Sequence, residues 1–175
     1  EEKRHTRHQM ICLAEGVPAY RLINTCQQGR YRIEKDVITD PRQEAVLLQR
    51  LRFTPLQGGL EAYHLYALLA PHLGNGGRGN TAWLGEYKGV PMLFAAREHT
   101  VLALACSVPW RQCSVGFVGT SDGWQDLMQH RRLTWNYTRA ENGNVALTGE
   151  VDLRAAHGTC ILSLGFGSSP AEAGH

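Results

Sequence analysis

Three glycines in one polar stretch have the spacing of a nucleotide-binding motif. Gly74, Gly76 and Gly79 form G-x-G-x-x-G. This motif holds a phosphate where a strand precedes it and a helix begins at the third glycine, because the free N–H groups of that helix face the phosphate. Here Gly85 and Gly89 follow too soon for a helix, and the pattern predicts strand, turn and strand. We therefore expect no bound cofactor, and a sharp turn at a sheet edge in which glycines allow positive φ.

Carboxylate pairs are the next candidates, because glycoside hydrolysis needs two carboxyl groups that flank the scissile bond. The acidic residues beside aromatic ones are Glu86, Asp122, Asp126 and Glu141. Simple structural roles are available to most of them: Asp122 can cap a helix, Glu141 precedes an Asn-Gly turn, and Glu86 can pair with Lys88. Their spacing brings no two of them together, so we predict no catalytic residue in this chain.

Histidines and cysteines show no metal-binding spacing. The sequence contains no C-x-x-C, H-x-x-x-H or H-E-x-x-H pattern, so we expect no metal site. The five cysteines cannot all pair within the chain, and most lie in apolar runs, which predicts free, buried thiols. Free thiols slightly favour a cytoplasmic location, while secretion stays open for a longer parent protein.

Aromatic side chains could bind sugars, because the face of an indole ring stacks on sugar C–H groups. The set is Trp83, Tyr87, Trp110, Trp124, Trp135 and Tyr137. Tryptophans of a β protein also fill its core and its domain interfaces, and we favour that interpretation for most of these rings.

The elements that must position these residues are mainly strands. Short apolar segments, separated by Gly, Pro, Asn and Asp, predict strands over 18–26, 30–39, 45–53, 62–70, 80–94 (strand, turn, strand), 100–108, 145–153 and 160–167. Segments 62–70 and 100–108 are apolar on both faces and are expected to be central strands. Segment 145–153 alternates between apolar and polar residues, which predicts one buried and one solvent-facing side.

Helical patterns are scarce. One short helix is expected near residues 122–130, where Trp124, Leu127 and Met128 share a face. Ser169 and Pro170 are typical of another helix start. Segment 40–51 could also form a helix, although its β-branched and aromatic continuation favours a strand.

These elements and the overall composition predict one all-β domain over residues 1–175. Roughly ten strands with almost no crossover helices are typical of a large antiparallel β-sandwich. The formal net charge of +2 and the scattered basic residues give no indication of nucleic-acid binding. We expect no membrane segment, because every apolar run is shorter than the ~18 residues of a span.

Several longer segments together resemble one known family. They are LLAPHLGNGGRGNTAWLGEYKGVPMLFA, ALACSVPW, SVGFVGTSDGWQDL and RAENGNVALTGEVDL, preceded in the family's order by EEKRHT, GVPAYRLINTC, YRIEKDVITDP and LRFTPL. Across essentially its whole length, the chain resembles the N-terminal domain of the bacterial glucoamylases and glucodextranases of glycoside hydrolase family 15.

The resemblance implies a β-sandwich of the galactose-mutarotase-like kind, followed in the full enzyme by a separate (α/α)6 toroid. The two catalytic glutamates of the family lie in that toroid, and no position here matches their motifs. The resemblance also implies strands that precede the EEKR segment. We therefore expect a fragment whose uncovered edge or face invites self-association.

Three functions follow as hypotheses. The first is a non-catalytic domain that packs on and supports the toroid of a glucan 1,4-α-glucosidase or glucodextranase. The second is a stand-alone carbohydrate-binding module, and the third is a small mutarotase-like enzyme, for which His72 and Glu86 are the nearest His–Glu pair. Contacts with the toroid or with an α-glucan are expected at Asn75, Arg78, Asn80, Trp83, Glu86, Tyr87 and Trp124.

Overall fold

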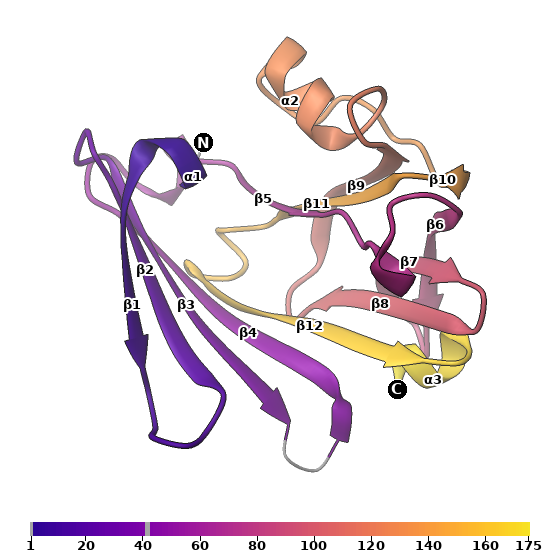
Figure 1. Ribbon diagram of the computed structural model, residues 1–175. Coiled ribbons are helices and arrows are strands. Elements are labelled where there is room, and N and C mark those ends of the chain that lie inside the picture. The colour runs from indigo at the N-terminus through magenta and orange to yellow at the C-terminus, as the bar shows by residue number, and fades with distance from the viewer. Residues whose placement is uncertain (1, 41–42) are drawn as a thin grey trace.

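The computed structural model describes residues 2–40 and 43–175. Over these residues the strands form a large sheet of nine strands, in the order β1-β2-β3-β4-β12-β8-β7-β6-β10, and a small sheet of three, in the order β5-β11-β9 (Figure 1). Each pair of neighbouring strands is antiparallel. The predicted all-β antiparallel sandwich is confirmed.

The bounds of the elements are as follows. The large sheet contains β1 (Thr6–Cys12), β2 (Ala19–Cys26), β3 (Tyr31–Asp40), β4 (Gln43–Pro55), β6 (Asn80–Tyr87), β7 (Val90–Arg97), β8 (Thr100–Cys106), β10 (Arg139–Gly143) and β12 (Thr159–Gly167). The small sheet contains β5 (Leu65–Leu69), β9 (Trp110–Phe117) and β11 (Val145–Val151). The helices are α1 (Glu2–His5), α2 (Gly123–His130) and α3 (Pro170–Gly174), with 3-10 turns at η1 (Leu60–Ala62) and η2 (Leu73–Asn75).

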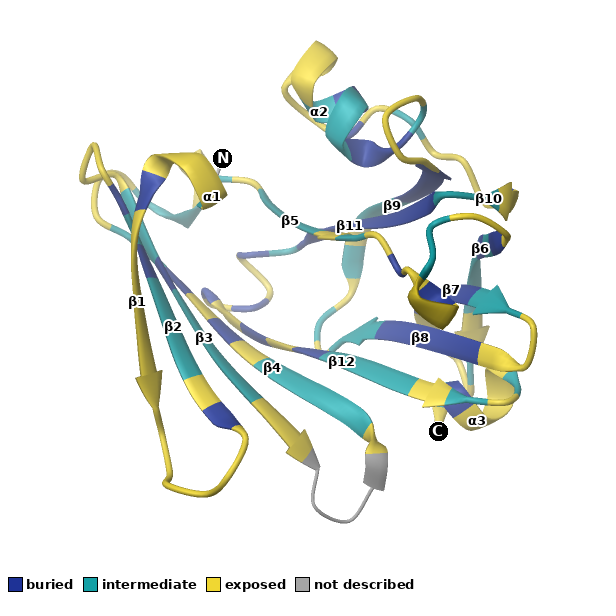
Figure 2. Cartoon of the chain, in the orientation of Figure 1, coloured by how far each residue is buried: buried dark blue, intermediate teal, exposed yellow. Residues whose placement is uncertain are grey.

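The main core lies where the small sheet packs on one half of the large sheet. Leu93 and Leu104 of the large sheet meet Val115 and Leu147 of the small sheet, and all four side chains are buried. The half of the large sheet that contains β1 and β2 extends beyond this contact (Figure 2), and Met10 on β1 is 69% exposed. The inner face of the large sheet is therefore only partly covered.

Strand β8 is central, between β12 and β7, and most of its residues are buried, as its two apolar faces predicted. The same prediction for residues 62–70 is wrong, because β5 is an edge of the small sheet and Leu68 is 45% exposed.

The predicted solvent face of 145–153 is also wrong. Residues Val145–Val151 are all buried, because β11 lies in the middle of the small sheet and α2 packs against its outer side at Thr148.

Strands β1, β9 and β10 were not predicted. Polar residues dominate β1 and β10, which form the two edges of the large sheet, so neither strand has the apolar run that marks a buried strand. The helix alternative for 40–51 is excluded from Gln43 onward, where the chain is in strand β4, while residues 41 and 42 lie outside the described residues.

Both predicted helix starts are confirmed. The Asp122 side chain accepts a hydrogen bond from the Gln125 N–H at the start of α2, and Ser169 caps α3 with Pro170 in its first turn. Of the predicted apolar face of α2, Trp124 and Leu127 are half-buried, but Met128 is exposed, and the fully buried residues of this helix are Gly123 and Asp126. No helix among the described residues has the length and apolar character needed to cross a membrane.

A row of charged side chains joins β2, β3 and β4 on the outer face of the large sheet. Arg21 donates to both carboxylate oxygens of Asp36, at 2.7 and 3.0 Å, and Arg50 donates to the same carboxylate. These partners, Arg21 above all, lower the pKa of Asp36 to about 2. Because the pKa of Asp36 is lower in the folded state than in the unfolded chain, the ionised Asp36 and its two arginines stabilise the fold above about pH 4. This stabilisation is lost as the pH falls through 2.

We expect Asp36→Asn to lower the free energy of unfolding by ~1 kcal/mol at pH 7, a modest value because the two arginines are partly exposed and solvent screens them. The difference from the wild type should shrink below pH 4 and vanish near pH 2, as measured by urea unfolding at a series of pH values. Glu141→Gln, which removes a more exposed pair with Arg139, is the control. A deficit that stays constant down to pH 2 would contradict the assignment.

Candidate functional site

The glycine-rich stretch is a tight loop between β5 and β6. Gly74, Asn75 and Gly79 have φ values of 67°, 59° and 74°, in the left-handed region that glycine and asparagine tolerate best. Strand β6 begins at Asn80, directly after the third glycine of the motif. No helix N-terminus faces the loop at that point, so the predicted strand, turn and strand is confirmed, and the phosphate-binding geometry is absent from these described residues.

Asn80 organises this loop from the inside. Its side chain is fully buried; Oδ1 accepts from the Leu73 N–H at 3.2 Å, and Nδ2 donates to the carbonyls of Gly76 and Gly77, both at 2.9 Å, and of Arg78 at 3.3 Å. Buried backbone N–H and C=O groups need hydrogen-bond partners, and this loop has no neighbouring strand to supply them. The amide of Asn80 is therefore engaged within the loop and is not available to a sugar.

Arg97 on β7 is a second organiser of the loop, and it was not predicted from the sequence. Its Nη1 donates to the Leu73 carbonyl at 3.0 Å, and its guanidinium lies so close to Gly76 that a Cβ there would be 2.8 Å from Nη1. A side chain at residue 76 would therefore displace the Arg97 guanidinium from its place against the loop. An isolated arginine at a turn carries no sequence signal for such a contact.

The other predicted contact residues are distributed over several surfaces. Asn75, Arg78 and Glu86 are exposed. Trp83 stacks on Phe94, with ring centroids 5.4 Å apart, and belongs with the half-buried Tyr87 to a small cluster on the α3 side of the large sheet. Because side chains alternate along a strand, Glu86 points to the opposite face of β6 from Trp83 and Tyr87. Trp124 comes from α2 and is half-buried.

The predicted His72–Glu86 pair does not form. His72 precedes the loop, whereas Glu86 lies about 20 Å beyond Asn80 at the ~3.3 Å rise per residue of a strand. A close His–Glu pair exists elsewhere, on the outer face of the small sheet. His64 Nδ1 lies 2.8 Å from Oε1 of the largely buried Glu150, and Arg111 Nε is 3.8 Å from the same oxygen.

Asp126 is the most strongly bonded acidic side chain in this region. It is fully buried in α2, and its carboxylate accepts from the Thr134 N–H (2.6 Å), the Trp135 N–H (2.7 Å) and the Thr134 hydroxyl (2.6 Å), with His130 Nδ1 at 2.7 Å. Burial raises the pKa of Asp126, but the donors outweigh burial and hold the pKa below its usual value. Asp126 thus fastens the segment after α2 to the helix.

The segment 133–138 has no regular secondary structure, yet its backbone is hydrogen-bonded to both sheets. Gln112 Nε2 donates to the Trp135 carbonyl at 3.2 Å, and the Val115 N–H donates to the Tyr137 carbonyl at 2.9 Å. The Leu84 N–H of β6 donates to the Thr138 carbonyl, also at 2.9 Å. The segment therefore closes one side of the sandwich between β9 and β6.

Three rings lie side by side on this segment and α2, and we call them the aromatic row: His130, Trp135 and Tyr137. The centroids of Trp135 and Tyr137 are 5.9 Å apart with an interplanar angle of 46°, and His130 meets Trp135 edge-on at 6.1 Å. Tyr137 is 47% exposed and Trp135 is half-buried. Trp135 and Tyr137 belong to the sequence-predicted aromatic set, but the row itself required the tertiary structure.

The cysteines are free, as predicted, although their burial varies. Cys26 and Cys160 are buried, Cys106 and Cys113 are half-buried, and Cys12 is exposed. The neighbouring Cys160 thiol lowers the pKa of Cys106 below its usual value. Among the described residues, no cluster of three or more His, Cys, Asp or Glu side chains is arranged to hold a metal ion.

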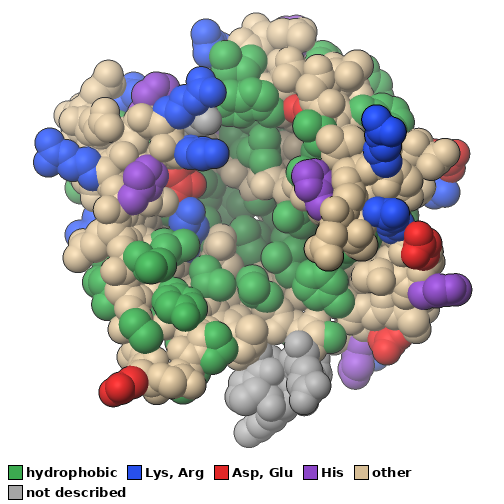
Figure 3. All heavy atoms as spheres, in the orientation of Figure 1, with side chains coloured by type: hydrophobic (Ala, Val, Ile, Leu, Met, Phe, Trp, Pro, Cys, Tyr) green, Lys and Arg blue, Asp and Glu red, His purple; other side chains and the backbone are tan. Residues whose placement is uncertain are grey.

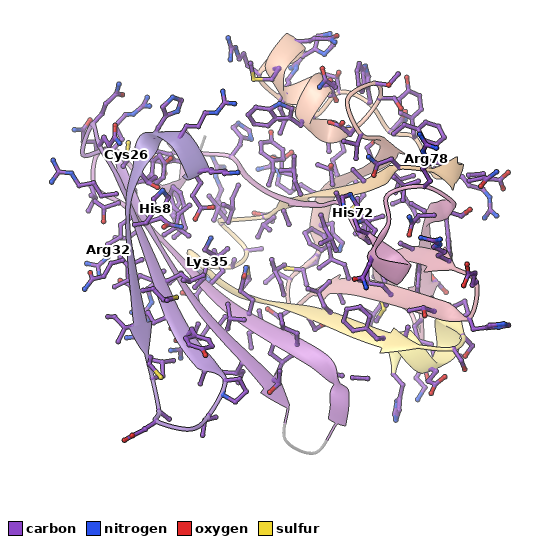
Figure 4. The ribbon with its side chains drawn as sticks, in the orientation of Figure 1. His8, Cys26, Arg32, Lys35, His72 and Arg78 are labelled. Carbon is purple, nitrogen blue, oxygen red and sulfur yellow. The ribbon has the colours of Figure 1, made fainter. Side chains whose placement is uncertain are left out.

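The uncovered inner face of the large sheet is hollowed and mainly aliphatic, with the polar side chains of Glu2, Lys35 and Gln49 at the hollow as well. A hollow of 260 Å³ is lined mainly by aliphatic side chains of β3, β4, β5, β8 and β12, among them Leu51, Leu104 and Leu164. Figure 3 shows hydrophobic side chains across the hollow and below it. In Figure 4, His8 and Lys35 lie on one side of the hollow, and His72 and Arg78 lie across from them.

The chain is thus a β-sandwich domain with two antiparallel sheets of unequal size. The segment 133–138 closes one side of the sandwich, and the larger sheet leaves part of its inner face uncovered. The model of the family "Glucodextranase, domain N" matches residues 1–175, and the chain belongs to this family. A glucoamylase of Clostridium sp. (strain G0005) is 32% identical over 154 residues, which are 88% of this chain and 22% of that protein.

A solved structure shows the same fold. The crystal structure of a bacterial glucoamylase complexed with acarbose matches with a TM-score of 0.93 at 30% identity. The match covers 98% of this chain and 25% of that chain. The chain thus spans about a quarter of the length of the glucoamylases that it resembles.

Proposed function

We propose that residues 1–175 form one non-catalytic β-sandwich domain of a glucoamylase-type glycoside hydrolase, which packs on and supports the catalytic part of the same polypeptide. The parent activity would be that of a glucan 1,4-α-glucosidase or a glucodextranase, with release of glucose from α-glucan ends. The observation that carries this proposal is the apolar inner face, because an exposed apolar surface of this kind marks an interaction site. The similar glucoamylases are about four times as long, so a parent protein has chain enough to cover it.

The carboxylates of the chain support a non-catalytic role. Asp122 caps α2, and Asp126 is buried with its oxygens occupied. Glu141 is hydrogen-bonded to the exposed Arg139, and Glu86 faces solvent from another strand. Three of the four carboxylates are thus occupied within the domain, whereas a general acid must be free to reach the leaving-group oxygen.

The exposed part of the glycine loop is a second proposed contact with the catalytic part or with a glucan chain. Asn75 and Arg78 supply an amide and a guanidinium at the loop surface, while Asn80 and Arg97 hold the loop in one shape beneath them. The mutarotase-like alternative gains no support from His72 and Glu86, since His72 precedes the glycine loop and Glu86 lies near the far end of β6.

The catalytic question is tested with the isolated chain and maltooligosaccharides. We expect no release of glucose above the buffer control. Glucose release that Glu86→Gln or Glu141→Gln abolishes would overturn the proposal.

The packing question is tested at β1, where Met10 and Ile11 are both exposed and point to opposite faces. In the isolated chain we expect concentration-dependent self-association through the inner face, which Met10→Lys weakens and Ile11→Lys does not, as measured by sedimentation velocity. In the full-length parent, Met10→Lys should lower the thermal unfolding midpoint and Ile11→Lys should not. Equal effects of the two variants would contradict packing through the inner face.

A further inference from the structure

We propose that the aromatic row is a binding platform for an α-glucan chain. Helix α2, which carries His130, lies on the outer side of the small sheet (Figure 1), where it packs against β11 at Thr148. The backbones of Trp135 and Tyr137 are bonded to Gln112 and Ser114 of β9, so the platform lies along α2 and β9. It is therefore separate from the inner face that is proposed above for packing. The two proposals rest on different residues and can fail independently.

The geometry of the rings fits a curved oligosaccharide. Sugar rings stack on aromatic faces through their C–H groups. In α-linked glucans each glucose unit is rotated relative to its neighbour, so two rings that contact successive units must be tilted relative to each other. The 46° between Trp135 and Tyr137 provides such a tilt, whereas a flat β-linked chain would need rings that are nearly coplanar.

The platform is held in place before any ligand binds. The bonds that anchor residues 135 and 137 use backbone atoms: the Trp135 N–H to Asp126, the Trp135 carbonyl to Gln112, the Tyr137 N–H to Ser114 at 3.2 Å and the Tyr137 carbonyl to Val115. The rings are thus free to contact a ligand, while the backbone that carries them is already ordered. Such ordering lowers the entropic cost of binding.

The surroundings of the rings are polar, as a sugar site requires. Thr134 and Asn136 are exposed next to the two rings in the sequence, and Arg132 is exposed at the end of α2. The amide and the guanidinium can donate to sugar oxygens, and the amide oxygen and the Thr134 hydroxyl, whose proton is donated to Asp126, can accept from sugar hydroxyls. A purely apolar patch would favour protein contact instead.

The test is a calorimetric or fluorescence titration of the 175-residue chain with maltoheptaose. We expect saturable binding that Trp135→Ala and Tyr137→Ala each weaken about tenfold or more, since loss of one stacked ring removes a contact of that order. Met128→Ala, at an exposed site on α2 outside the row, is the matched control and should bind as the wild type does. Cellohexaose should bind at least tenfold more weakly, because its β-linkages make a flatter chain.

Variant folding is controlled by thermal unfolding, and Trp135→Phe, which keeps an aromatic face, should retain more affinity than Trp135→Ala. No saturable binding by the wild type, or undiminished binding by both alanine variants, would overturn the proposal. Equal loss of affinity in Met128→Ala would overturn it as well. None of these results depends on the comparison of Met10→Lys with Ile11→Lys. The glucan proposal and the proposal that the inner face packs on the catalytic part are therefore tested separately.

Discussion

Asp126→Ala is expected to lower the free energy of unfolding by about 3 kcal/mol, one of the two largest effects that we foresee. The substitution leaves the partly buried N–H groups of Thr134 and Trp135 without their carboxylate acceptor and removes the contact between Asp126 and His130. The segment 133–138 should then loosen from α2. Urea unfolding at pH 7 measures the stability, and amide hydrogen exchange over 133–138 measures the loosening.

Asp126→Asn separates the hydrogen bonds from the charge. The oxygen that accepts from both the Thr134 and the Trp135 N–H groups can be kept, and the new NH₂ can donate to the Thr134 hydroxyl. We expect a loss of ~1 kcal/mol, because charge-assisted bonds are stronger than neutral ones. An equally large loss in the asparagine and alanine variants would show that the charge, rather than the acceptor geometry, holds the segment.

The second large effect is expected at the glycine loop. Asn80→Ala should cost about 3 kcal/mol, because it leaves the carbonyls of Gly76 and Gly77 and the Leu73 N–H without their buried partner. The loop should then exchange its amide hydrogens faster than β6, which follows it. Thermal and urea unfolding measure the loss of stability.

Asn80→Asp is the informative companion, since it keeps the size of the side chain but replaces a donor by an acceptor that faces backbone carbonyls. We expect it to be at least as unstable as Asn80→Ala. Arg78→Ala, at the exposed surface of the same loop, should change stability by less than about 0.5 kcal/mol. A mild effect of Asn80→Asp would mean that packing, and not hydrogen bonding, accounts for the buried amide.

Local features of this protein could be predicted because they depend on neighbours in the sequence. The turn around Gly74 and Gly79 follows from steric limits on φ, and the caps at Asp122 and Ser169 follow from unpaired N–H groups at a helix start. Apolar runs marked most strands, including the central β8. The resemblance to the glucoamylase N-terminal domain rested on whole motifs and held across the full chain.

Burial and side-chain partnership depended on contacts between distant segments. The alternation in 145–153 predicted an exposed face, but α2 and His64 cover that face from elsewhere in the chain. Asp126 was a plausible acid in the sequence and became a buried acceptor through residues eight and nine positions later. Likewise, the sequence did not distinguish Trp83 from Trp135. In the structure Trp83 stacks on Phe94 beside α3, whereas Trp135 belongs to the aromatic row.

The sequence by itself determined that the chain is an antiparallel β protein, that a strand and not a helix follows its glycine motif, and that it resembles the glucoamylase family. Steric limits on φ, strand periodicity and long family motifs are all properties of the local sequence. Only the tertiary structure decided which polar groups are buried, which aromatic rings face solvent together and which apolar face lacks a partner. These properties arise when sheets pack, because packing removes water from some faces and leaves it on others.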